Sequence, residues 1–366
     1  MIRVATTLLV FTTLGRLAFL SEGLPQADAQ PPGGSPVNPP PASPEQTVKL
    51  RVASWNLESG DSNPEVLGRE MAIKQGVDLW GLSEVNVRFL PILERGAEDG
   101  ENADFAAING TTGDEDRLVI LYDRGEFLTL GERIELREVM VGNPGLRAPL
   151  AQRFRIRKTG QEFLFMVNHL KRGGAQNPER HEQAKRLNAW ARGQTTPIIA
   201  VGDYNFDYDV RRGDEGPPHR DRGFDLLTAN QVFTWVKPER LLKTHSDASV
   251  NSILDFVFIS KPPANWSLKS VILDRERDAP ATAFGYRDDS QESDHRPIDA
   301  VITIDTRGLR DTVAGSNATM RSDAARRNEL VKQIEKLEAE LKTLRDALKK
   351  TEGSEPSSPP PTKPRR

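Results

Sequence analysis

Carboxylate, amide and imidazole side chains stand in this sequence where apolar, strand-like runs come to an end. Strand ends are where a sheet presents functional groups to a shared cleft, so side chains on several strands can act together. A set rich in Asp, Glu and Asn oxygens is typical of a site for a hard cation such as Mg²⁺ or Ca²⁺, whereas zinc favours nitrogen and sulfur ligands. The residues that follow this pattern are Asn56, Glu84, Asn168, His169, Asp203, Asn205, Asp294 and His295.

Taken one at a time, these residues have simpler explanations. Asn56 and Asn205 belong to a residue type that commonly forms turns, and Glu84 could be a charge at the start of a helix. The segment SDHRP at 293–297 is equally consistent with a turn before the strand-like run that follows it. Only the joint pattern argues for a catalytic site.

The elements that must position these side chains are short runs rich in β-branched and aromatic residues. Two helices are predicted over 64–76 and 178–194, with Pro64 and Pro178 in their first turns and Gly76 as a stop. Many strands and few helices predict an α/β fold of two packed sheets flanked by helices, and the lack of a repeat of fixed period argues against a solenoid. The predicted strands are 48–57, 78–85, 117–123, 162–170, 197–205, 253–260 and 298–304.

A series of motifs over roughly 48–303 resembles the endonuclease/exonuclease/phosphatase superfamily, which includes deoxyribonuclease I, AP endonucleases and neutral sphingomyelinases. The resemblance implies a four-layer α/β/β/α sandwich of two packed mixed sheets and metal-dependent hydrolysis of phosphoesters. It places the catalytic domain at 47–305. The motifs, in the order and spacing of that family, are SWNLES, LSEV, RAPLAQRF, VNHL, VGDYNFD, SILDFVFIS and SDHRPI.

The resemblance also implies roles for individual residues. Asn56 and Glu84 match the metal-binding pair and Asp294 a further ligand, with Mg²⁺ as the expected ion and Mn²⁺ or Ca²⁺ as alternatives. Asp203 would orient or deprotonate the attacking water, and Asn205 would hold a phosphate oxygen. A cation is needed because an anionic phosphodiester repels hydroxide.

The two histidines and their partners complete the implied site. His295 would donate a proton to the phosphoryl group and be oriented by Asp255, because a histidine paired with a buried carboxylate stays protonated near neutral pH. His169 resembles the second histidine of the deoxyribonuclease I branch. Asp116 or Glu115 is the expected carboxylate partner of His169. Arg147 and Tyr122 are the expected substrate contacts, and no role is expected for His181, His219 and His245.

Three functions are compatible with these observations. Two histidines favour an exported nuclease of deoxyribonuclease I type that acts on a phosphodiester substrate, with nucleic acid as the expected substrate. A sphingomyelinase or phosphoinositide-type phosphoesterase is the alternative; it would need an exposed apolar hairpin, for which 262–268 is the candidate. The third is a catalytically idle scaffold. A net charge of -3 and a pI near 6.1 exclude a protein whose whole surface binds nucleic acid by charge.

The N-terminal segment predicts export. Arg3, an apolar stretch and the small residues before Gln30 fit a signal peptide over 1–29, although Arg16 interrupts the apolar run. The stretch is too short and too interrupted for a stable membrane span. We therefore expect a secreted or periplasmic protein, followed at 30–46 by a Pro-rich linker. The absence of cysteine excludes disulfides and a lipid anchor on cysteine.

The C-terminal segment predicts a coiled coil over 326–351, after a linker at 306–325 and before a disordered tail at 352–366. Such a helix would make a homo-oligomer possible. The alternative is a single amphipathic helix docked on the body. The apolar seam consists of Leu330, Ile334, Leu337, Leu341, Leu344 and Leu348.

Overall fold

The computed structural model describes residues 46–309 apart from 59, 102, 175, 212–218, 248, 274–291 and 308, together with Lys336. All of these residues belong to one compact unit, Glu45–Arg366. The predicted signal peptide lies outside the described residues, as does the Pro-rich linker except for Gln46. The same holds for the linker at 306–325 beyond its first residues, the coiled coil apart from Lys336, and the tail.

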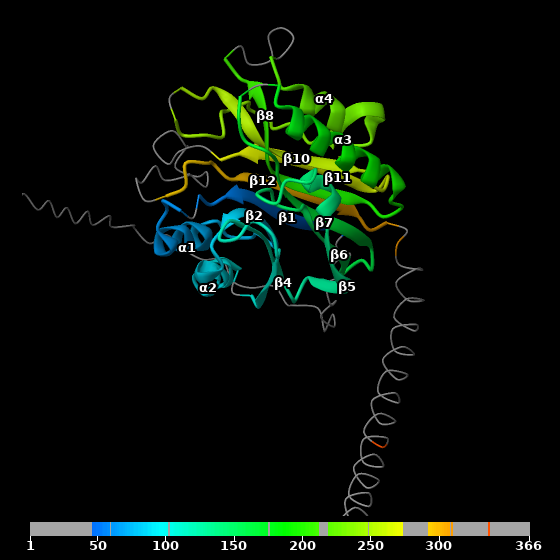
Figure 1. The fold of residues 1–366 in the computed structure, drawn as a ribbon. Coiled ribbons are helices and arrows are strands. Elements are labelled where there is room, and N and C mark those ends of the chain that lie inside the picture. The colour runs from blue at the N-terminus through cyan, green and yellow to red at the C-terminus, as the bar shows by residue number, and fades with distance from the viewer. Residues whose placement is uncertain are drawn as a thin grey trace, which may run out of the picture. The chain divides into compact units, whose positions relative to one another are not determined.

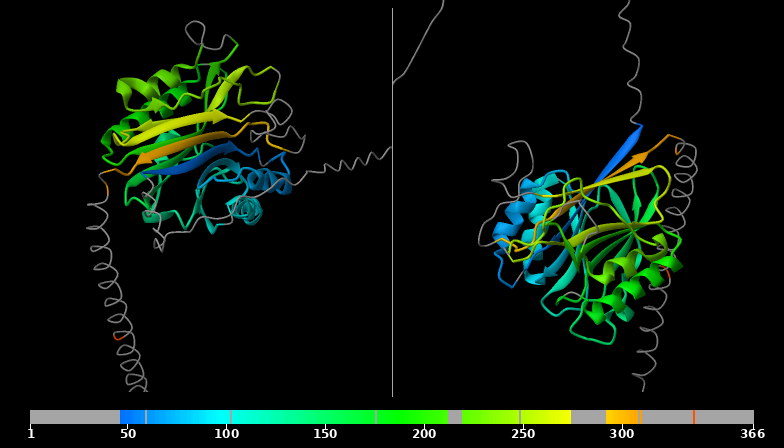
Figure 2. Two further views of the ribbon diagram at one scale, coloured as in Figure 1. Left: turned by 180° about the vertical axis from the view of Figure 1, so that it is seen from behind. Right: turned by 90° about the horizontal axis from the view of Figure 1, so that it is seen from above.

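Two six-stranded sheets pack face to face and form the centre of the fold (Figure 1, Figure 2). The first has the strand order β11-β12-β1-β2-β4-β3 and the second β5-β6-β7-β8-β10-β9. Both are mixed, because β1 and β2 pair in parallel, as do β7 and β8, while the other pairs are antiparallel. The strands are β1 (Thr47–Asn56), β2 (Leu79–Val85), β3 (Phe105–Asn109), β4 (Arg117–Asp123), β5 (Phe127–Glu135), β6 (Leu150–Ile156), β7 (Glu162–His169), β8 (Ile198–Asp209), β9 (Thr234–Trp235), β10 (Ser252–Ser260), β11 (Trp266–Ile272) and β12 (Ile298–Asp305).

Helices cover the outer face of each sheet (Figure 1). One core joins α1 (Pro64–Ile73) and α2 (Leu90–Glu101) to the first sheet through residues such as Leu67 and Trp80. The other core fills the space between the sheets and reaches α3 (Pro178–Gly193) and α4 (Arg222–Thr228). Short 3₁₀ turns complete the fold at η1 (Val87–Phe89), η2 (Arg137–Met140) and η3 (Ala229–Gln231). Among the described residues, no helix combines the length and apolar character that crossing a membrane requires.

The two predicted helices begin where the sequence places them. Asn63 caps α1 by accepting a hydrogen bond from the backbone of Glu65, and Asn177 caps α3 in the same way. Proline follows each cap, at the position where its missing N–H costs nothing. The predicted α/β sandwich is therefore confirmed, although α1 ends at Ile73, before the predicted stop at Gly76.

Helix α2 was not predicted, because glycines interrupt its sequence. Gly96 lies where α2 crosses α1, and a Cβ atom there would approach the carbonyl oxygen of Gly68 to 2.4 Å. The glycine that lowers helix propensity is thus the residue that lets the two backbones meet. Strands β3, β5, β6, β9 and β11 and helix α4 were not predicted either.

Candidate active site

Strand register aligns three predicted catalytic residues in one row of the second sheet. The parallel pairing of β7 with β8 places His169 opposite Asp203. The antiparallel pairing of β8 with β10 places Asp255 opposite Asp203 from the other side. Side chains aligned on neighbouring strands lie about 5 Å apart, so the row brings an imidazole and two carboxylates together.

The backbone of these strands adopts unusual conformations at the site. Gly202 has φ 131°, and a Cβ atom there would lie 2.0 Å from the carbonyl oxygen of Asn168, so only glycine allows β8 to approach β7 so closely. Glu84 and Asn205 have φ values of 52° and 53°, which are costly for residues other than glycine. Glu84 also lies in an irregularity of the β2–β4 ladder. Strain of this kind is found where side chains are held for function.

Glu84 and Asp203 share two nitrogen neighbours. The Nε2 atom of His169 lies 3.5 Å from Oε1 of Glu84 and 3.6 Å from Oδ2 of Asp203. The Nδ2 atom of Asn56 donates to the same two oxygens at 3.2 and 3.3 Å. The ends of both sheets therefore meet at one cluster, in which Asn56, His169 and Asp203 are buried.

His295 lies between two carboxylates. Its Nδ1 atom is 2.7 Å from Oδ2 of Asp255, and its Nε2 atom is 3.9 Å from Oδ2 of Asp203. Burial alone would lower the pKa of His295, but the charge and hydrogen bond of Asp255, with the charges of Asp203 and Asp294, raise it to about 10. His295 is therefore a protonated donor at neutral pH.

Asp203 and His169 carry pKa shifts of opposite direction. Burial and the neighbouring charge of Asp255 raise the pKa of Asp203 to about 7, against the opposing charge of His295. Burial, followed by the positive charge of Arg147, holds the pKa of His169 well below its usual value. His169 is therefore neutral, unlike His295. Asp203 is poised to accept a proton near neutral pH.

A pocket of about 200 Å³ opens above this cluster. Asn205 reaches it from β8, where its backbone N–H donates to Oδ1 of Asp203 at 2.9 Å and its Nδ2 donates to the carbonyl oxygen of Leu170 at 3.2 Å. The pocket thus has acid, base and amide groups on its walls. It is lined by Glu84, Arg172, Gly173, Asp203, Asn205, Asp207, His245, Val250, Leu254 and His295.

Solved structures with the same fold include a protein that is named for its family. A Bacteroides thetaiotaomicron protein of the endonuclease/exonuclease/phosphatase family is 18% identical, with a TM-score of 0.50 over 72% of this chain and 98% of its own. Two structures of D. rerio TDP2 score higher. One, humanized by 14 mutations, has a TM-score of 0.53 at 18% identity. The other, complexed with a single strand DNA product, has a TM-score of 0.52 at 17% identity. Each covers 69% of this chain and 98% of its own.

This chain has the endonuclease/exonuclease/phosphatase fold. No model of a protein family matches its sequence, and no curated protein matches it. The fold that the resemblance implies is therefore confirmed.

Asp116 and Glu115, one of which was expected to pair with His169, both have other partners. Asp116 accepts a hydrogen bond from Arg147 at 2.7 Å, and the exposed Glu115 lies 3.8 Å from Arg88. Neither carboxylate pairs with His169, whose acidic neighbours are Glu84 and Asp203. Arg147 thus occupies the contact with Asp116 that was expected for His169. Arg147 remains close enough to lower the pKa of His169, as a phosphate-facing arginine would be.

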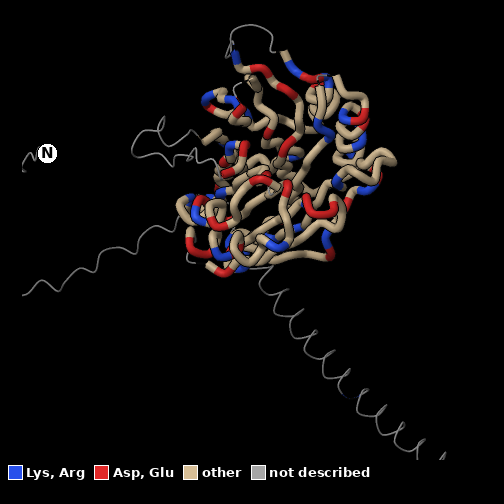
Figure 3. Tube along the Cα trace, turned by 60° about the vertical axis from the view of Figure 1, so that its left-hand side comes forward, with Lys and Arg blue, Asp and Glu red and all other residues tan. Residues whose placement is uncertain are grey.

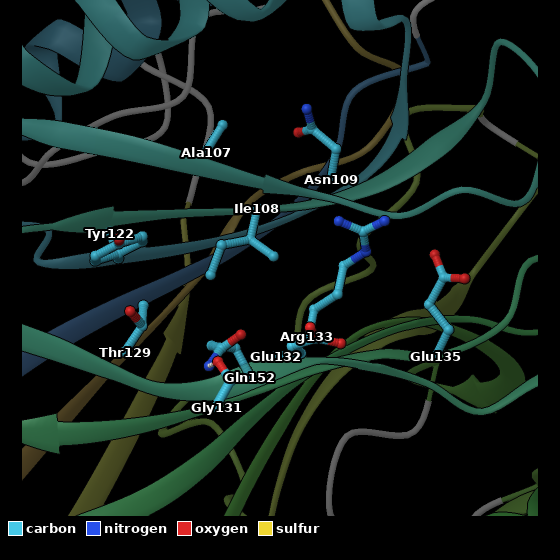
Figure 4. Close-up of a pocket in the computed structure, with 10 residues that line it drawn as sticks. All are labelled: Ala107, Ile108, Asn109, Tyr122, Thr129, Gly131, Glu132, Arg133, Glu135 and Gln152. Atoms are coloured by element: carbon cyan, nitrogen blue, oxygen red, sulfur yellow. Dashed lines mark hydrogen bonds between the residues drawn. The ribbon is translucent and has the colours of Figure 1, made fainter. Parts of the chain in front are cut away.

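Tyr122 does not reach the catalytic pocket. It pairs with Leu79 at the start of β2, whereas Glu84 lies five residues further along that strand, a distance of roughly 17 Å. Its ring packs 5.1 Å from that of Phe154, and it lines a separate groove of about 770 Å³ between the edges of the two sheets (Figure 4). The structure therefore places Tyr122 outside the catalytic pocket, and its role as a substrate contact stays a prediction.

His245 is a site residue that the sequence reading missed. Its Nδ1 atom accepts a hydrogen bond from the backbone N–H of Asp247 at 3.1 Å, so in the neutral ring the proton is on Nε2. That atom lies 2.9 Å from Oδ2 of Asp294, and the ring packs edge-on against His295 at 5.0 Å. With Nε2 protonated, His245 donates to Asp294. Its loop position gave no signal in the sequence.

Asp294 lies in a different environment from Asn56 and Glu84, with which it was grouped as a metal ligand. His245 holds one of its oxygens, and Nε2 of His295 lies 3.8 Å from the other. Glu58 accepts a hydrogen bond from the backbone of Asp294 at 2.9 Å, and burial together with the charge of Asp294 raises the pKa of Glu58. The assignment of Asp294 as a ligand stays a prediction.

The cluster fits the divalent cation that the fold family implies. Glu84 and Asp203 converge on the same neighbours, and after burial the charges of Asp255 and Glu84 raise the pKa of Asp203. Carboxylate oxygens are the ligands that Mg²⁺ and Mn²⁺ prefer. The amide oxygen of Asn56 accepts from the backbone of Glu58 at 3.1 Å, so Asn56 would ligate only after its amide turns.

Proposed function

We propose that this chain is a metal-dependent phosphoesterase that hydrolyses phosphodiester bonds, with nucleic acid as its substrate. The observation that carries the proposal is one pocket lined by both Asp203 and His295, with Asp255 2.7 Å from the imidazole of His295. In this setting the pKa of Asp203 is raised to about 7 and that of His295 to about 10. Asp203 and His295 are thus a base and an acid at neutral pH, and hydrolysis of a phosphodiester requires both.

The residues divide the reaction between them. Asp203 accepts a proton from the attacking water as its oxygen bonds to phosphorus. His295 gives its proton to the oxygen that leaves when the other phosphorus–oxygen bond breaks, while Asp255 keeps the ring oriented and charged. Asn205 offers its remaining amide N–H to a phosphate oxygen. A bound divalent cation, held by Glu84 and Asn56, would supply charge neutralisation of the phosphate.

The described surface supports a nuclease over a lipid phosphodiesterase. The candidate apolar hairpin at 262–268 does not expose its aromatic residue, because Trp266 is buried and its Nε1 donates to Gln161 at 3.0 Å. Among the described large apolar side chains, only Ile73 and Val271 are exposed. Figure 3 shows acidic and basic positions interspersed over the described fold, so contacts with nucleic acid would be local.

Export and oligomerisation are separate proposals. Both depend on segments outside the described residues, namely 1–29 for export and 326–351 for a homo-oligomer. Fusing residues 1–46 to a reporter that is active only outside the cytoplasm tests the first. A silent reporter would contradict export.

A substrate panel tests the proposed activity. The purified protein is assayed against single- and double-stranded DNA, RNA, sphingomyelin and a synthetic bis-phosphodiester, with Mg²⁺, Mn²⁺ or Ca²⁺ and with EDTA. We expect hydrolysis of nucleic acid that EDTA abolishes and Mg²⁺ or Mn²⁺ restores. Glu84→Gln should raise the metal concentration needed for half-maximal rate. Activity that persists in EDTA would contradict metal dependence, and cleavage of sphingomyelin alone would favour the lipid enzyme.

A further inference from the structure

The loop that follows β7 brings a cation and a glycine to the rim of the catalytic pocket. Arg172 and Gly173 line that pocket together with Asp203 and His295. Arg172 is exposed, and no described acidic side chain pairs with it. A pocket of about 200 Å³ is too small for a polynucleotide, so a bound strand would have to leave it across this rim.

A buried arginine holds the loop from beneath. The guanidinium of Arg180 donates to the carbonyl oxygens of Lys171 at 2.8 Å, Gly173 at 3.1 Å and Gly174 at 3.1 Å. It also pairs with Asp221 at 2.9 Å, and both charged groups are fully buried. Three carbonyl oxygens of one short loop are therefore turned inward.

The inward carbonyls direct backbone N–H groups outward. In a trans peptide the C=O and the following N–H point in opposite directions, and the described chain has no cis peptide bond. The N–H groups of Arg172 and Gly174 therefore point away from Arg180, and no described residue accepts a hydrogen bond from either. Outward N–H groups beside an unpaired guanidinium are typical of an anion site.

Arg172 lies beside the catalytic residues, because it lines the same pocket as Glu84, Asp203 and His295. The loop is thus near the scissile phosphate while lying outside the row of catalytic side chains. This position suits a phosphate adjacent to the one being cleaved.

We propose that Lys171–Gly174 forms a second anion subsite, which binds a phosphate next to the scissile one in a nucleic-acid strand. Arg172 contacts that phosphate through its guanidinium, and the N–H groups of Arg172 and Gly174 donate to its oxygens. Arg180 is a positioning residue that holds the loop. This inference rests on the proposed function and narrows its substrate to chains that carry several phosphates.

The test compares a substrate with one phosphate to a substrate with several. A thymidine dinucleotide has a single phosphodiester, whereas a thymidine pentanucleotide has phosphates on both sides of the cleaved bond. Kinetics are measured on the full-length protein with Mg²⁺ for wild type, Arg172→Ala and Arg172→Lys. Arg133→Ala is the matched control, because Arg133 is equally exposed but lines the separate groove.

We expect Arg172→Ala to lower kcat/KM for the pentanucleotide by about tenfold or more, mainly through KM, as the loss of a charge-assisted hydrogen bond predicts. The loss for the dinucleotide should be smaller, no more than about threefold, and Arg172→Lys should recover part of the difference. The slope of log KM against log salt for the pentanucleotide should fall by about one. Arg180→Lys should lose the same preference for the longer substrate without a change in the pH profile.

Several results would overturn the subsite. Equal losses on the two substrates would assign Arg172 to the scissile phosphate, and an equal effect of Arg133→Ala would show a nonspecific effect of charge. Wild-type kinetics in Arg172→Ala would remove the subsite and leave the proposed function standing. A wild-type protein that cleaves neither substrate would refute the proposed function, and the subsite with it. If Arg180→Lys fails to fold, Arg172→Ala alone decides.

Discussion

Asp255 and His295 form a buried pair whose chemistry depends on the strand register more than on either residue alone. The carboxylate of Asp255 is 2.7 Å from Nδ1 of His295, in a place where water cannot compete. Burial by itself would make the imidazole neutral, and the neighbouring carboxylates reverse that outcome. The same burial without a carboxylate partner on its Nδ1 leaves His169 neutral. Two histidines a few ångströms from one aspartate are thus given opposite charges.

Replacing Asp255 with Asn should lower the pKa of His295. Burial lowers the pKa of His295, and Asp255 makes the largest contribution that raises it to about 10. In Asp255→Asn the pKa of His295 should therefore fall to about 6.5 or below. NMR titration of the histidine side chains in metal-free protein measures this. Because the folded pKa is raised, the pair stabilises the fold fully below pH about 6.5 and loses that effect as pH rises towards 10. A His295 pKa that is unchanged in Asp255→Asn would contradict this account.

Much of the site could be predicted at the level of residues, because strand ends are visible in a sequence. His169 ends β7 and His295 lies just before β12, as the strand pattern predicted, whereas β8 continues past Asp203 to Asp209. The role of Asp255 was predicted from the family resemblance and not from a strand end. Pairings between loops could not be predicted. His245 gains its position from a backbone bond and an aspartate far along the chain, and neither leaves a periodic pattern.

At the level of elements, the ion pair between Arg180 and Asp221 joins α3, α4 and the loop after β7. Asp221 accepts from Arg180 and from the backbone of Gln176 and Gly223, so the pair fixes three segments at once. Breaking such a pair leaves a buried charge without compensation, and this costs far more than an exposed pair contributes.

Asp221→Asn should therefore destabilise the fold by about 3–5 kcal/mol. Burial would raise the pKa of Asp221, but the hydrogen bond from Arg180 and its other donors lower it. The pair therefore stabilises the fold above the unfolded pKa of about 3.9, and this effect disappears as pH falls through the folded value. Urea unfolding at pH 7 and pH 3 measures both effects. Asp225→Asn is the control, because Asp225 forms an exposed pair with Arg220. Equal costs in the two variants would contradict the prediction.

The sequence predicted the central elements better than the peripheral ones. Strands such as β8 and β10 are buried on both faces, and their β-branched and aromatic composition is typical of buried strands. The edge strand β5 is partly exposed and carries an irregularity between Leu130 and Ile134, so its pattern is diluted by polar residues and glycine. Helix α2 was not predicted because Gly96, which lets α2 pack closely against α1, lowers the helix propensity of its sequence.

At the level of the whole molecule, the catalytic fold ends before the predicted coiled coil, so oligomerisation and chemistry should be separable. The seam from Leu330 to Leu348 spans only about three heptads, and association through it should depend on concentration. A chain ending at Arg310 should be monomeric with unchanged specific activity. Leu337→Asp combined with Leu344→Asp should dissociate the full chain. Analytical ultracentrifugation distinguishes these cases, and a monomeric full-length chain at tens of micromolar would show that the helix docks on the body.

The central claim is that the row of His169, Asp203 and Asp255, with His295 beside it, is a hydrolytic site. The most direct test is the Mg²⁺-dependent rate of phosphodiester hydrolysis by Asp203→Asn. Asp209→Asn, on the same strand and in an exposed pair with Arg211, is the matched control. We predict a loss of about 10²–10⁴-fold in kcat for Asp203→Asn and a wild-type rate for the control, with both proteins folded. A wild-type rate in folded Asp203→Asn would contradict the account.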